Sequence, residues 1–390
     1  MAASLPTPFA AAAEAAQHGG MIGPHSYRLF VNPRWGTPGV VVLPEGGFRR
    51  AREEITSWPG YAPTPLRELP PQGFARLAYK DEAERFGLGS FKALGGAYAV
   101  LRVVLAELAR RGIGTTAASL LAHPRPLDIT LTCATDGNHG RSVAWGAQRL
   151  GARCVIFVHE GVSQGRREAI AAYGAEVREV PGNYDDAVRE AARQAEAHGW
   201  HVVSDTSYPG YTEIPREVMQ GYRLMAEEAL DQLGEPPTHV FIQGGVGGVA
   251  AAVSVQLRAR RVPAKLVVVE PEAAACLLAS AEAGKPTSIP GELPTLMAGL
   301  ACGEPSLLAW QELERAAHAF MAVPDAAAVE AMRALRALGI VAGESAVAGL
   351  VGALLAGRDG ALGLGPESRV LVFGTEGATD PVLYEQLTAA

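Results

Sequence analysis

The sequence has few cysteines and no obvious metal-binding pattern. Its 390 residues include only four cysteines, and none of them forms a CxxC pair. Cys133 and Cys154 lie in apolar runs that read as strands, and Cys276 and Cys302 are isolated. Scattered thiols of this kind are typical of a reducing compartment and argue against a disulfide framework or a zinc site. We therefore expect no metal site.

Long apolar runs and basic clusters are also absent. No run reaches the roughly 18 apolar residues of a membrane span, and the alanine-rich N-terminus has no basic region before Glu14. We expect neither a signal peptide nor a membrane anchor, and a cytoplasmic protein whose residues 1–24 are flexible. The formal charge of −7 and the lack of basic runs beyond 258–261 argue against nucleic acid and anionic membranes as partners.

The chain is longer than a single compact core usually is. With 48% hydrophobic and 19% charged residues, the chain can bury a sizeable core. Its length of 390 residues predicts two lobes. Short β-branched runs alternate with helical patterns in its middle, which is typical of a parallel sheet covered by helices. The runs are residues 128–133, 153–158, 176–180 and 201–203, and the helical patterns are 141–150, 165–173 and 185–198.

A second set of apolar runs flanks this region. Each of them reads as a buried parallel strand, at residues 239–243, 265–270 and 369–374. We therefore predict an α/β fold with two open, twisted sheets of parallel type, flanking helices and a functional site in the cleft between a large and a small lobe. The large lobe would comprise residues 25–124 and 206–390, and the small lobe would be inserted as residues 125–205.

Four loops carry candidate chemistry at the strand ends, where ligands of α/β proteins bind. In the first, RFGLGSFKALGGAYAV (85–100), Lys92 begins a helix, where the helix dipole disfavours a cation. A lysine that forms a Schiff base, with a lowered pKa, would fit this position. A solvated lysine after a flexible loop fits the same stretch, so this loop alone leaves both interpretations open.

The second loop, GGVGG (244–248), lies between an apolar strand and a helical segment. Consecutive glycines leave backbone N–H groups uncovered, and together with the positive end of a helix they can bind a phosphate. Residues 245–250 also have the G-x-G-x-x-A form of a dinucleotide-binding turn, with Glu270 at the end of the next strand. A tight turn without a ligand is the third interpretation.

The other two loops bring a carboxylate and a hydroxyl to strand ends. In TCATDGNHGRSVAWG (132–146), Asp136 precedes a helix, where an aspartate commonly serves as the N-cap. In FGTEGATDP (373–381), Thr375 follows the last strand and could hold a ring nitrogen or cap a turn. Neither loop decides its role by itself.

Together the four loops resemble a known group of enzymes. Ser90-Phe91-Lys92, TDGNHG, GGVGG and a last strand that ends in a hydroxyl follow the order found in the fold-type II, tryptophan synthase β-like, pyridoxal-phosphate enzymes. Within that group, residues 25–385 are similar to the diaminopropionate ammonia-lyases. The blocks that carry this similarity are KDEAERFGLGSFKALGGAYA (80–99), ATDGNHGRSVAW (134–145), NYDDAVREA (183–191), SDTSYPGYTEIPREVMQGY (204–222), TLMAGLACGEPS (295–306) and TEGATDP (375–381).

The resemblance implies pyridoxal 5'-phosphate as the cofactor and names the residues that would hold it. Lys92 would bind it through a Schiff base and then act as a base. Asn138 would hydrogen-bond the ring hydroxyl, and Thr375 would face the ring nitrogen without forcing it to stay protonated. The phosphate would be cradled by the backbone of Gly244, Gly245, Val246, Gly247 and Gly248. Members of this group are commonly homodimers, so a homodimer is the expected assembly.

The implied activity is α,β-elimination of 2,3-diaminopropionate, of the D or L form or both, to pyruvate and two molecules of ammonia. Asp136 would take the α-proton of the D-substrate while Lys92 takes that of the L-substrate, or it would bind the β-ammonium group. Asp205 would bind the distal amine or assist the base on the D side, although a plain crossover turn is the simpler interpretation. The implied substrate-binding residues are Thr135, Asp136, Asp205 and Tyr208.

Two stretches near the expected substrate entrance depart from the family pattern. Tyr208 and Pro209 stand where related ammonia-lyases usually have a tryptophan and an acidic residue, and HEGVSQGRREAI (159–170) lacks a Pro-Lys-Gly opening. Glu344 could face the cofactor ring or favour the dipole of its own helix. A serine or threonine dehydratase of the same fold therefore stays as an alternative, and an NAD-dependent dehydrogenase as a remote one.

Overall fold

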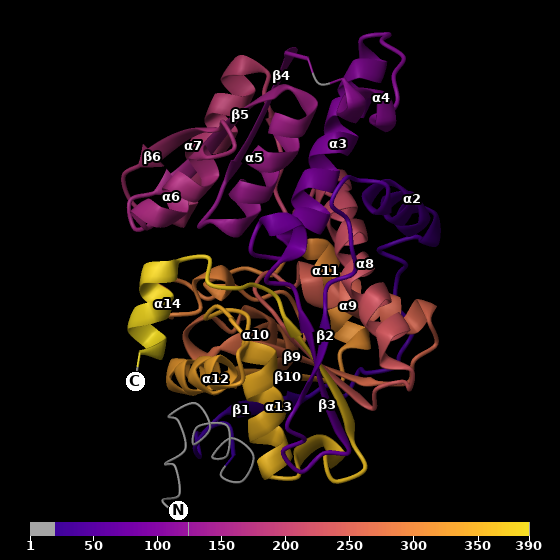
Figure 1. Cartoon of the computed structure of the whole chain (residues 1–390), viewed down its shortest axis with the longest axis vertical. Coiled ribbons are helices and arrows are strands. Elements are labelled where there is room, and N and C mark those ends of the chain that lie inside the picture. The colour runs from indigo at the N-terminus through magenta and orange to yellow at the C-terminus, as the bar shows by residue number, and fades with distance from the viewer. Residues whose placement is uncertain (1–19, 124, 390) are drawn as a thin grey trace, which may run out of the picture.

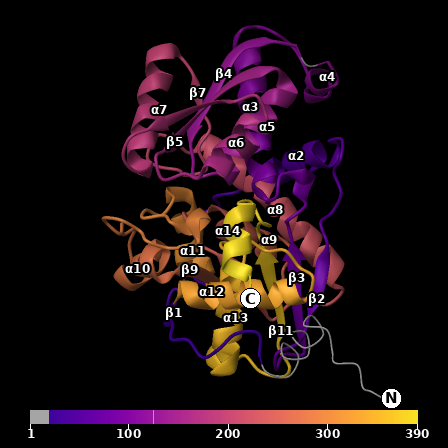
Figure 2. The ribbon, with the colours of Figure 1, turned by 60° about the vertical axis from the view of Figure 1, so that its left-hand side comes forward.

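A computed structural model describes residues 20–123 and 125–389. Two lobes lie one above the other, each with one sheet and its covering helices (Figures 1 and 2). Most of the segment predicted to be flexible, residues 1–24, lies outside the described residues. Within its described part, Met21 is buried, and the Gly23 N–H donates to Glu330 at 2.7 Å.

The lower lobe in Figure 1 is built on a seven-stranded mixed sheet. In spatial order its strands are β1 (Arg28–Val31), β10 (Ala319–Val323), β9 (Lys265–Pro271), β8 (His239–Gln243), β11 (Arg369–Gly374), β3 (Arg76–Asp81) and β2 (Leu66–Leu69). The five inner strands are parallel, which confirms the three predicted members β9, β8 and β11 as neighbours at the centre. The edge strands β1 and β2 are antiparallel to their neighbours, which the sequence did not indicate.

The upper lobe contains a four-stranded sheet whose strands are all parallel, as predicted. In spatial order these are β6 (Glu176–Val180), β5 (Ala152–His159), β4 (Leu127–Ala134) and β7 (His201–Val202). Its helices are α5 (Asn138–Leu150), α6 (Gln164–Ala171) and α7 (Tyr184–His198). These elements all fall within the predicted insertion, residues 125–205, whose boundaries remain a proposal.

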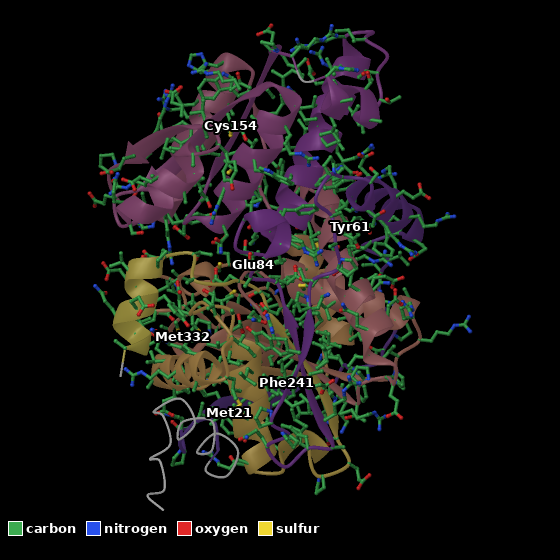
Figure 3. The ribbon with its side chains drawn as sticks, viewed as in Figure 1. Met21, Tyr61, Glu84, Cys154, Phe241 and Met332 are labelled. Atoms are coloured by element: carbon green, nitrogen blue, oxygen red, sulfur yellow. The ribbon has the colours of Figure 1, made fainter. Side chains whose placement is uncertain are left out.

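Helices cover both faces of the large sheet. Along β8, Val240 and Ile242 pack in the core on the side of α9, whereas Phe241 packs on the side of α13, so both faces are buried. Figure 3 shows Phe241 and Met332 in this lower lobe and Cys154 in the upper one. The lower-lobe helices are α2 (Glu45–Thr56), α8 (Glu213–Leu233), α9 (Gly248–Ala259), α10 (Cys276–Ala283), α11 (Leu307–Ala316), α12 (Asp325–Ala337), α13 (Ala348–Arg358) and α14 (Pro381–Thr388).

One long helix joins the lobes. α3 (Lys92–Arg110) packs against α5 of the upper lobe and α8 of the lower one, and α4 (Ala117–Ala122) follows it at the top of Figure 1. The short 3-10 segments are η1 (Arg85–Gly87), η2 (Glu272–Ala274), η3 (Ala298–Leu300) and η4 (Ala361–Gly363). Among the described residues, no helix combines the length and apolar character that a membrane crossing requires.

A buried ion network holds the segment that leads to Lys92. Arg85 donates to Glu82 at 2.8 Å and to Glu228 at 2.7 Å, and Lys80 Nζ donates to Glu228 at 2.8 Å. All four side chains are almost completely buried. Because buried charges are tolerated only when they are paired, this network fixes the chain between β3 and α3.

Arg85→Met is expected to destabilise the fold strongly. The substitution leaves Glu82 and Glu228 buried without the guanidinium, which should cost about 3–5 kcal/mol of the free energy of unfolding. Urea unfolding followed by circular dichroism measures this loss. Arg49→Met, at an exposed arginine on α2, is the matched control and should change stability by less than about 0.5 kcal/mol. Similar losses in both variants would contradict a stabilising role for the network.

Candidate active site between the lobes

The predicted site residues come from strand ends and helix starts of both lobes. Lys92 is the first residue of α3, Asp136 follows β4, and Asp205 follows β7. All three act on one partly buried thiol: the pKa of Cys302 is raised to about 12 by burial and then by Asp136 and Asp205, while Lys92 opposes the shift. Cys302 Sγ also lies 3.8 Å from the position that a Cβ on Gly245 would take. The structure therefore brings the lysine, both carboxylates and the glycine loop close to Cys302.

Lys92 forms a short ion pair with Asp205. Lys92 Nζ donates to Asp205 Oδ2 at 2.6 Å, and it lies 5.4 Å and 5.6 Å from the ring centroids of Phe91 and Tyr222. Burial on its own lowers the pKa of Lys92, but Asp205, together with Tyr222 and Cys302, outweighs burial and holds this pKa above its usual range. The ion pair therefore favours the protonated amine, and the lowered pKa expected for a Schiff-base lysine remains a prediction.

Asp205 is held as a carboxylate by Lys92. Burial alone would raise the pKa of Asp205, but the charge and the hydrogen bond of Lys92 hold it below the usual range. His139 Nδ1 lies 3.8 Å from Asp205 Oδ2, and its Nε2 lies 2.7 Å from Val203 O, to which it can donate. Burial lowers the pKa of His139, which favours the neutral imidazole. Asp205 thus belongs to the site, which a plain crossover turn would not explain.

Asp205→Asn is expected to lower the pKa of the Lys92 amine. The substitution removes the group that raises this pKa but leaves the burial that lowers it. Acylation of the lysine amines is measured at a series of pH values by mass spectrometry on cofactor-free protein. The pH at which Lys92 becomes reactive should be lower in the variant. Lys265 and Lys285 in the same sample are internal references, and Asp128→Asn, at an exposed aspartate, is the control. An unchanged Lys92 profile would contradict the pairing.

Asp136 does not cap the following helix. Gly137 is the N-cap residue of α5, and Thr135 Oγ1 accepts from the N–H groups of Gly137 at 3.0 Å and Gly140 at 3.1 Å. Asp136 Oδ1 instead lies 3.0 Å from His159 Nε2. The capping interpretation of Asp136 is therefore wrong, because its carboxylate contacts His159 instead.

Two other predicted substrate contacts interact with the protein itself. Thr135 is buried, and its Oγ1 accepts a hydrogen bond from the Gly137 N–H at the start of α5. Tyr208 is 53% exposed and stacks on Tyr211 with ring centroids 5.0 Å apart. Roles for Thr135 and Tyr208 in binding substrate remain predictions.

The glycine loop offers a phosphate cradle with fewer donors than predicted. The Gly244 N–H donates to Val269 O at 2.8 Å, and the Gly247 N–H donates to Gly244 O at 2.9 Å. Within the described part of the chain, the amides of Gly245, Val246 and Gly248 have no such acceptor and lie at the start of the 12-residue helix α9. Three amides at a helix N-terminus fit a phosphate group.

Asn138 and Thr375 each keep a hydrogen-bond donor available for the ring of a ligand. Asn138 Nδ2 donates to Glu376 Oε2, and because an amide nitrogen carries two hydrogens, the second stays free for another acceptor. Thr375 is buried, and its Oγ1 lies 3.2 Å from Gln243 Nε2, whose two hydrogens have the closer acceptors Ala346 O and Phe373 O. Because an amide nitrogen accepts no hydrogen bond, the hydroxyl hydrogen of Thr375 is not used there. Both residues can therefore hydrogen-bond a ligand as predicted.

Sequence reasoning missed Tyr184, and the structure gives new partners to Glu344. Tyr184 begins α7, and its pKa is raised well above the usual range by burial and then by Asp205 and Asp136, so its phenol lies near both carboxylates. The block NYDDAVREA contained this residue, but no pattern marked it. Glu344 precedes α13 and pairs with Arg166 at 2.6 Å, while burial and Glu376 raise the pKa of Glu344 to about 7.

Glu270 is not available for a nicotinamide cofactor. Its two carboxylate oxygens accept the backbone N–H groups of Leu277 at 2.9 Å and Leu278 at 2.8 Å, and the side chain is completely buried. The acidic residue of a dinucleotide-binding turn must reach a ribose instead. The dehydrogenase alternative therefore lacks its ribose ligand. Among the residues described, no cluster of three or more potential metal ligands occurs.

Comparison with known proteins decides the family. Residues 57–376 match the model of the family described as pyridoxal-phosphate dependent enzyme. The chain belongs to this family. It is 41% identical over 350 residues to the diaminopropionate ammonia-lyase of Escherichia coli, which covers 84% of this chain and 87% of that protein.

Solved structures of this family agree with the fold. Two crystal structures of the Escherichia coli diaminopropionate ammonia-lyase, one with D-serine and one with an aminoacrylate-PLP azomethine reaction intermediate, each give a TM-score of 0.85 at 35% identity. Each covers 94% of this chain and 98% of its own. The predicted resemblance, the fold-type II architecture and pyridoxal phosphate as the cofactor are thereby confirmed.

The residues at the site fit pyridoxal phosphate. The free amides of Gly245, Val246 and Gly248 suit its phosphate, and the chain gives these amides no other acceptor among the described residues. Gly247 has φ +95°, and a Cβ there would come 3.0 Å from Ala309 Cβ, so a larger residue would distort the cradle. Lys92 would hold the aldehyde carbon of the cofactor.

Proposed function

We propose that the chain catalyses the α,β-elimination of 2,3-diaminopropionate to pyruvate and two molecules of ammonia. The observation that carries this proposal is the presence of two carboxylates near the Cys302 thiol: Asp205, which pairs with Lys92, and Asp136. The substrate has two amino groups, and two carboxylates can pair with both charges. The identity to a named diaminopropionate ammonia-lyase supports the same reaction.

Bound pyridoxal phosphate would supply an electron sink for negative charge at the substrate Cα. Lys92 would then take the α-proton of the L-substrate, and Asp136 that of the D-substrate, from opposite faces. The β-amino group leaves as ammonia once the Cβ–N bond breaks. Hydrolysis of the remaining enamine gives pyruvate and the second ammonia.

The Lys92–Asp205 pair suggests how a diamine substrate prepares the base. While Asp205 accepts from Lys92, its charge favours the protonated amine. A substrate ammonium that binds Asp205 would compete for the same carboxylate and weaken its hold on Lys92. The pKa of Lys92 would then fall, since burial is the largest of the remaining influences, and the neutral amine could act as a base. Serine has no second amine to do this.

Substrate turnover tests the proposal. Purified holoenzyme is incubated with D- and L-diaminopropionate, D- and L-serine and L-threonine, and pyruvate, 2-oxobutyrate and ammonia are measured. We expect the highest kcat/KM for diaminopropionate, with two ammonia per pyruvate. A higher kcat/KM for serine or threonine would instead assign a dehydratase of the same fold. The homodimer and the cytoplasmic location remain predictions, of which sedimentation equilibrium tests the first.

A further inference from the structure

His159 lies at the end of β5 and contacts Asp136 with a defined tautomer. His159 Nε2 lies 3.0 Å from Asp136 Oδ1, and the Gly161 N–H donates to His159 Nδ1 at 3.1 Å. Because Nδ1 accepts a hydrogen bond, the ring hydrogen of the neutral imidazole lies on Nε2. Nε2 therefore donates to Asp136, and the two contacts fix the orientation of the ring.

The ring position depends on the glycine beside it. A Cβ on Gly161 would come 2.8 Å from His159 Cε1 and 3.0 Å from its Nδ1, closer than side chains can pack. Gly161 has no positive φ, so its backbone alone would accept alanine. A methyl group at this position would therefore displace the imidazole from Asp136 while leaving His159 in the chain.

We propose that His159 is a positioning residue that orients the Asp136 carboxylate and tunes its basicity, and thereby sets the preference of the site for D- over L-diaminopropionate. This inference rests on the proposed function. Nε2 carries a hydrogen in both protonation states of the ring, so it cannot accept the substrate proton from Asp136. It engages Oδ1 and leaves Oδ2 of Asp136 for the α-proton of the D-substrate.

The protonation of His159 should change the D-reaction with pH. The hydrogen bond to Asp136 raises the pKa of His159, burial opposes this, and the charges of Asp136 and Glu160 add to it. Below that pKa the imidazolium makes Asp136 a weaker base, and above it the neutral ring only orients the carboxylate. D-elimination should therefore rise as the pH passes through the pKa of His159, and L-elimination, which uses Lys92, should lack this step.

Three other side chains lie near the Asp136–His159 pair. Tyr184 from α7 and the Cys302 thiol face Asp136 and are both influenced by its charge. Arg166 from α6 packs on Gly137, where its Cδ lies 3.4 Å from the position of a Cβ, and its charge is paired with Glu344. The hydrogen bonds of the His159 side chain in the described structure go to Asp136 and Gly161 and to none of these groups, so its substitution isolates the histidine.

Three variants separate the contributions of His159. His159→Phe keeps a ring but loses the donor, Gly161→Ala displaces the ring, and His159→Gln keeps a donor that does not titrate. His123→Gln, at an exposed histidine directly after α4, is the matched control. kcat/KM is measured for both enantiomers from about pH 5.5 to 9, the range in which histidine titrates.

The expected results differ between the variants. The Phe and Ala variants should lower the D/L ratio of kcat/KM about tenfold, the size expected for loss of a hydrogen bond to a charged group. The Gln variant should keep most of the ratio at high pH and lose the pH step of the D-reaction. The control should change neither. D/L ratios and pH profiles like those of the unsubstituted enzyme in all three variants would overturn the inference.

A readout without turnover distinguishes the two proposals. NMR of holoenzyme labelled with ¹⁵N-histidine follows the titration of His159, which should shift to lower pH in Asp136→Asn because the carboxylate that raises its pKa is gone. An unchanged titration would overturn the inference whatever the substrate is. A normal shift in an enzyme that does not turn over diaminopropionate would overturn the proposed function and, with it, the assigned D/L preference.

Discussion

Asp136→Asn is expected to lower kcat/KM for D-diaminopropionate by about 10²–10⁴-fold, the usual contribution of a positioned base, and to leave the L-reaction within about threefold. The carboxylate that would take the D-side proton becomes an amide that cannot. The L-side proton would go to Lys92, which is paired with Asp205 rather than with Asp136. Pyruvate formation from each pure enantiomer measures the two effects separately.

This substitution suits the local structure. Asparagine is isosteric, and its carbonyl oxygen can still accept from His159 Nε2, so the turn after β4 should keep its shape. The free backbone N–H groups at the start of α5 donate to Thr135 and not to Asp136. Asp128→Asn, at the exposed start of β4, controls for the loss of one charge. Equal losses on both enantiomers would contradict the two-base mechanism and assign Asp136 to binding the substrate ammonium.

Lys92→Ala is expected to abolish elimination of both enantiomers, with a loss of about 10⁴-fold or more, because one amine both holds the cofactor and acts as a base. Lys80 cannot replace it, since its Nζ is buried against Thr64 O and Glu228. Steady-state pyruvate formation measures the loss, and added methylamine should restore a small part of it.

A matched lysine variant controls this result. Lys285→Ala removes an exposed lysine and should leave turnover unchanged. Because Lys92→Ala also leaves Asp205 without its partner, folding is checked by circular dichroism, and Lys92→Gln is the second variant. Turnover within about tenfold of the unsubstituted enzyme in both Lys92 variants would contradict the assignment.

The core strands could be predicted from the sequence because their residues are buried on both faces. Runs such as HVFIQ and KLVVVE carry three or four consecutive apolar residues, and they became β8 and β9. β2 (LREL) and β1 (RLFV) lie at sheet edges and are partly exposed, so they carry no such signal. β10 (AFMAV) is fully buried but was not recognised in the alanine-rich stretch that contains it.

The candidate site was predictable where a local motif carries the chemistry. Lys92, Asn138, the glycine loop and Thr375 each lie in a short recognisable block. The electrostatics were not predictable in this way, because Asp205 reaches Lys92 across 113 residues of sequence and reverses the shift that the helix dipole and burial suggest. His159 was also missed, since its contact with Asp136 depends on the register of β5 beside β4.

Borohydride trapping tests the central assignment most directly. The sequence contains four lysines, at positions 80, 92, 265 and 285, so a reduced cofactor can be located by peptide mass spectrometry without ambiguity. We predict that reduction of the holoenzyme leaves one pyridoxyl phosphate group per chain, on Lys92, and removes the visible absorbance of the enzyme. Attachment at another lysine, or no attachment to an enzyme that still forms pyruvate, would contradict the account.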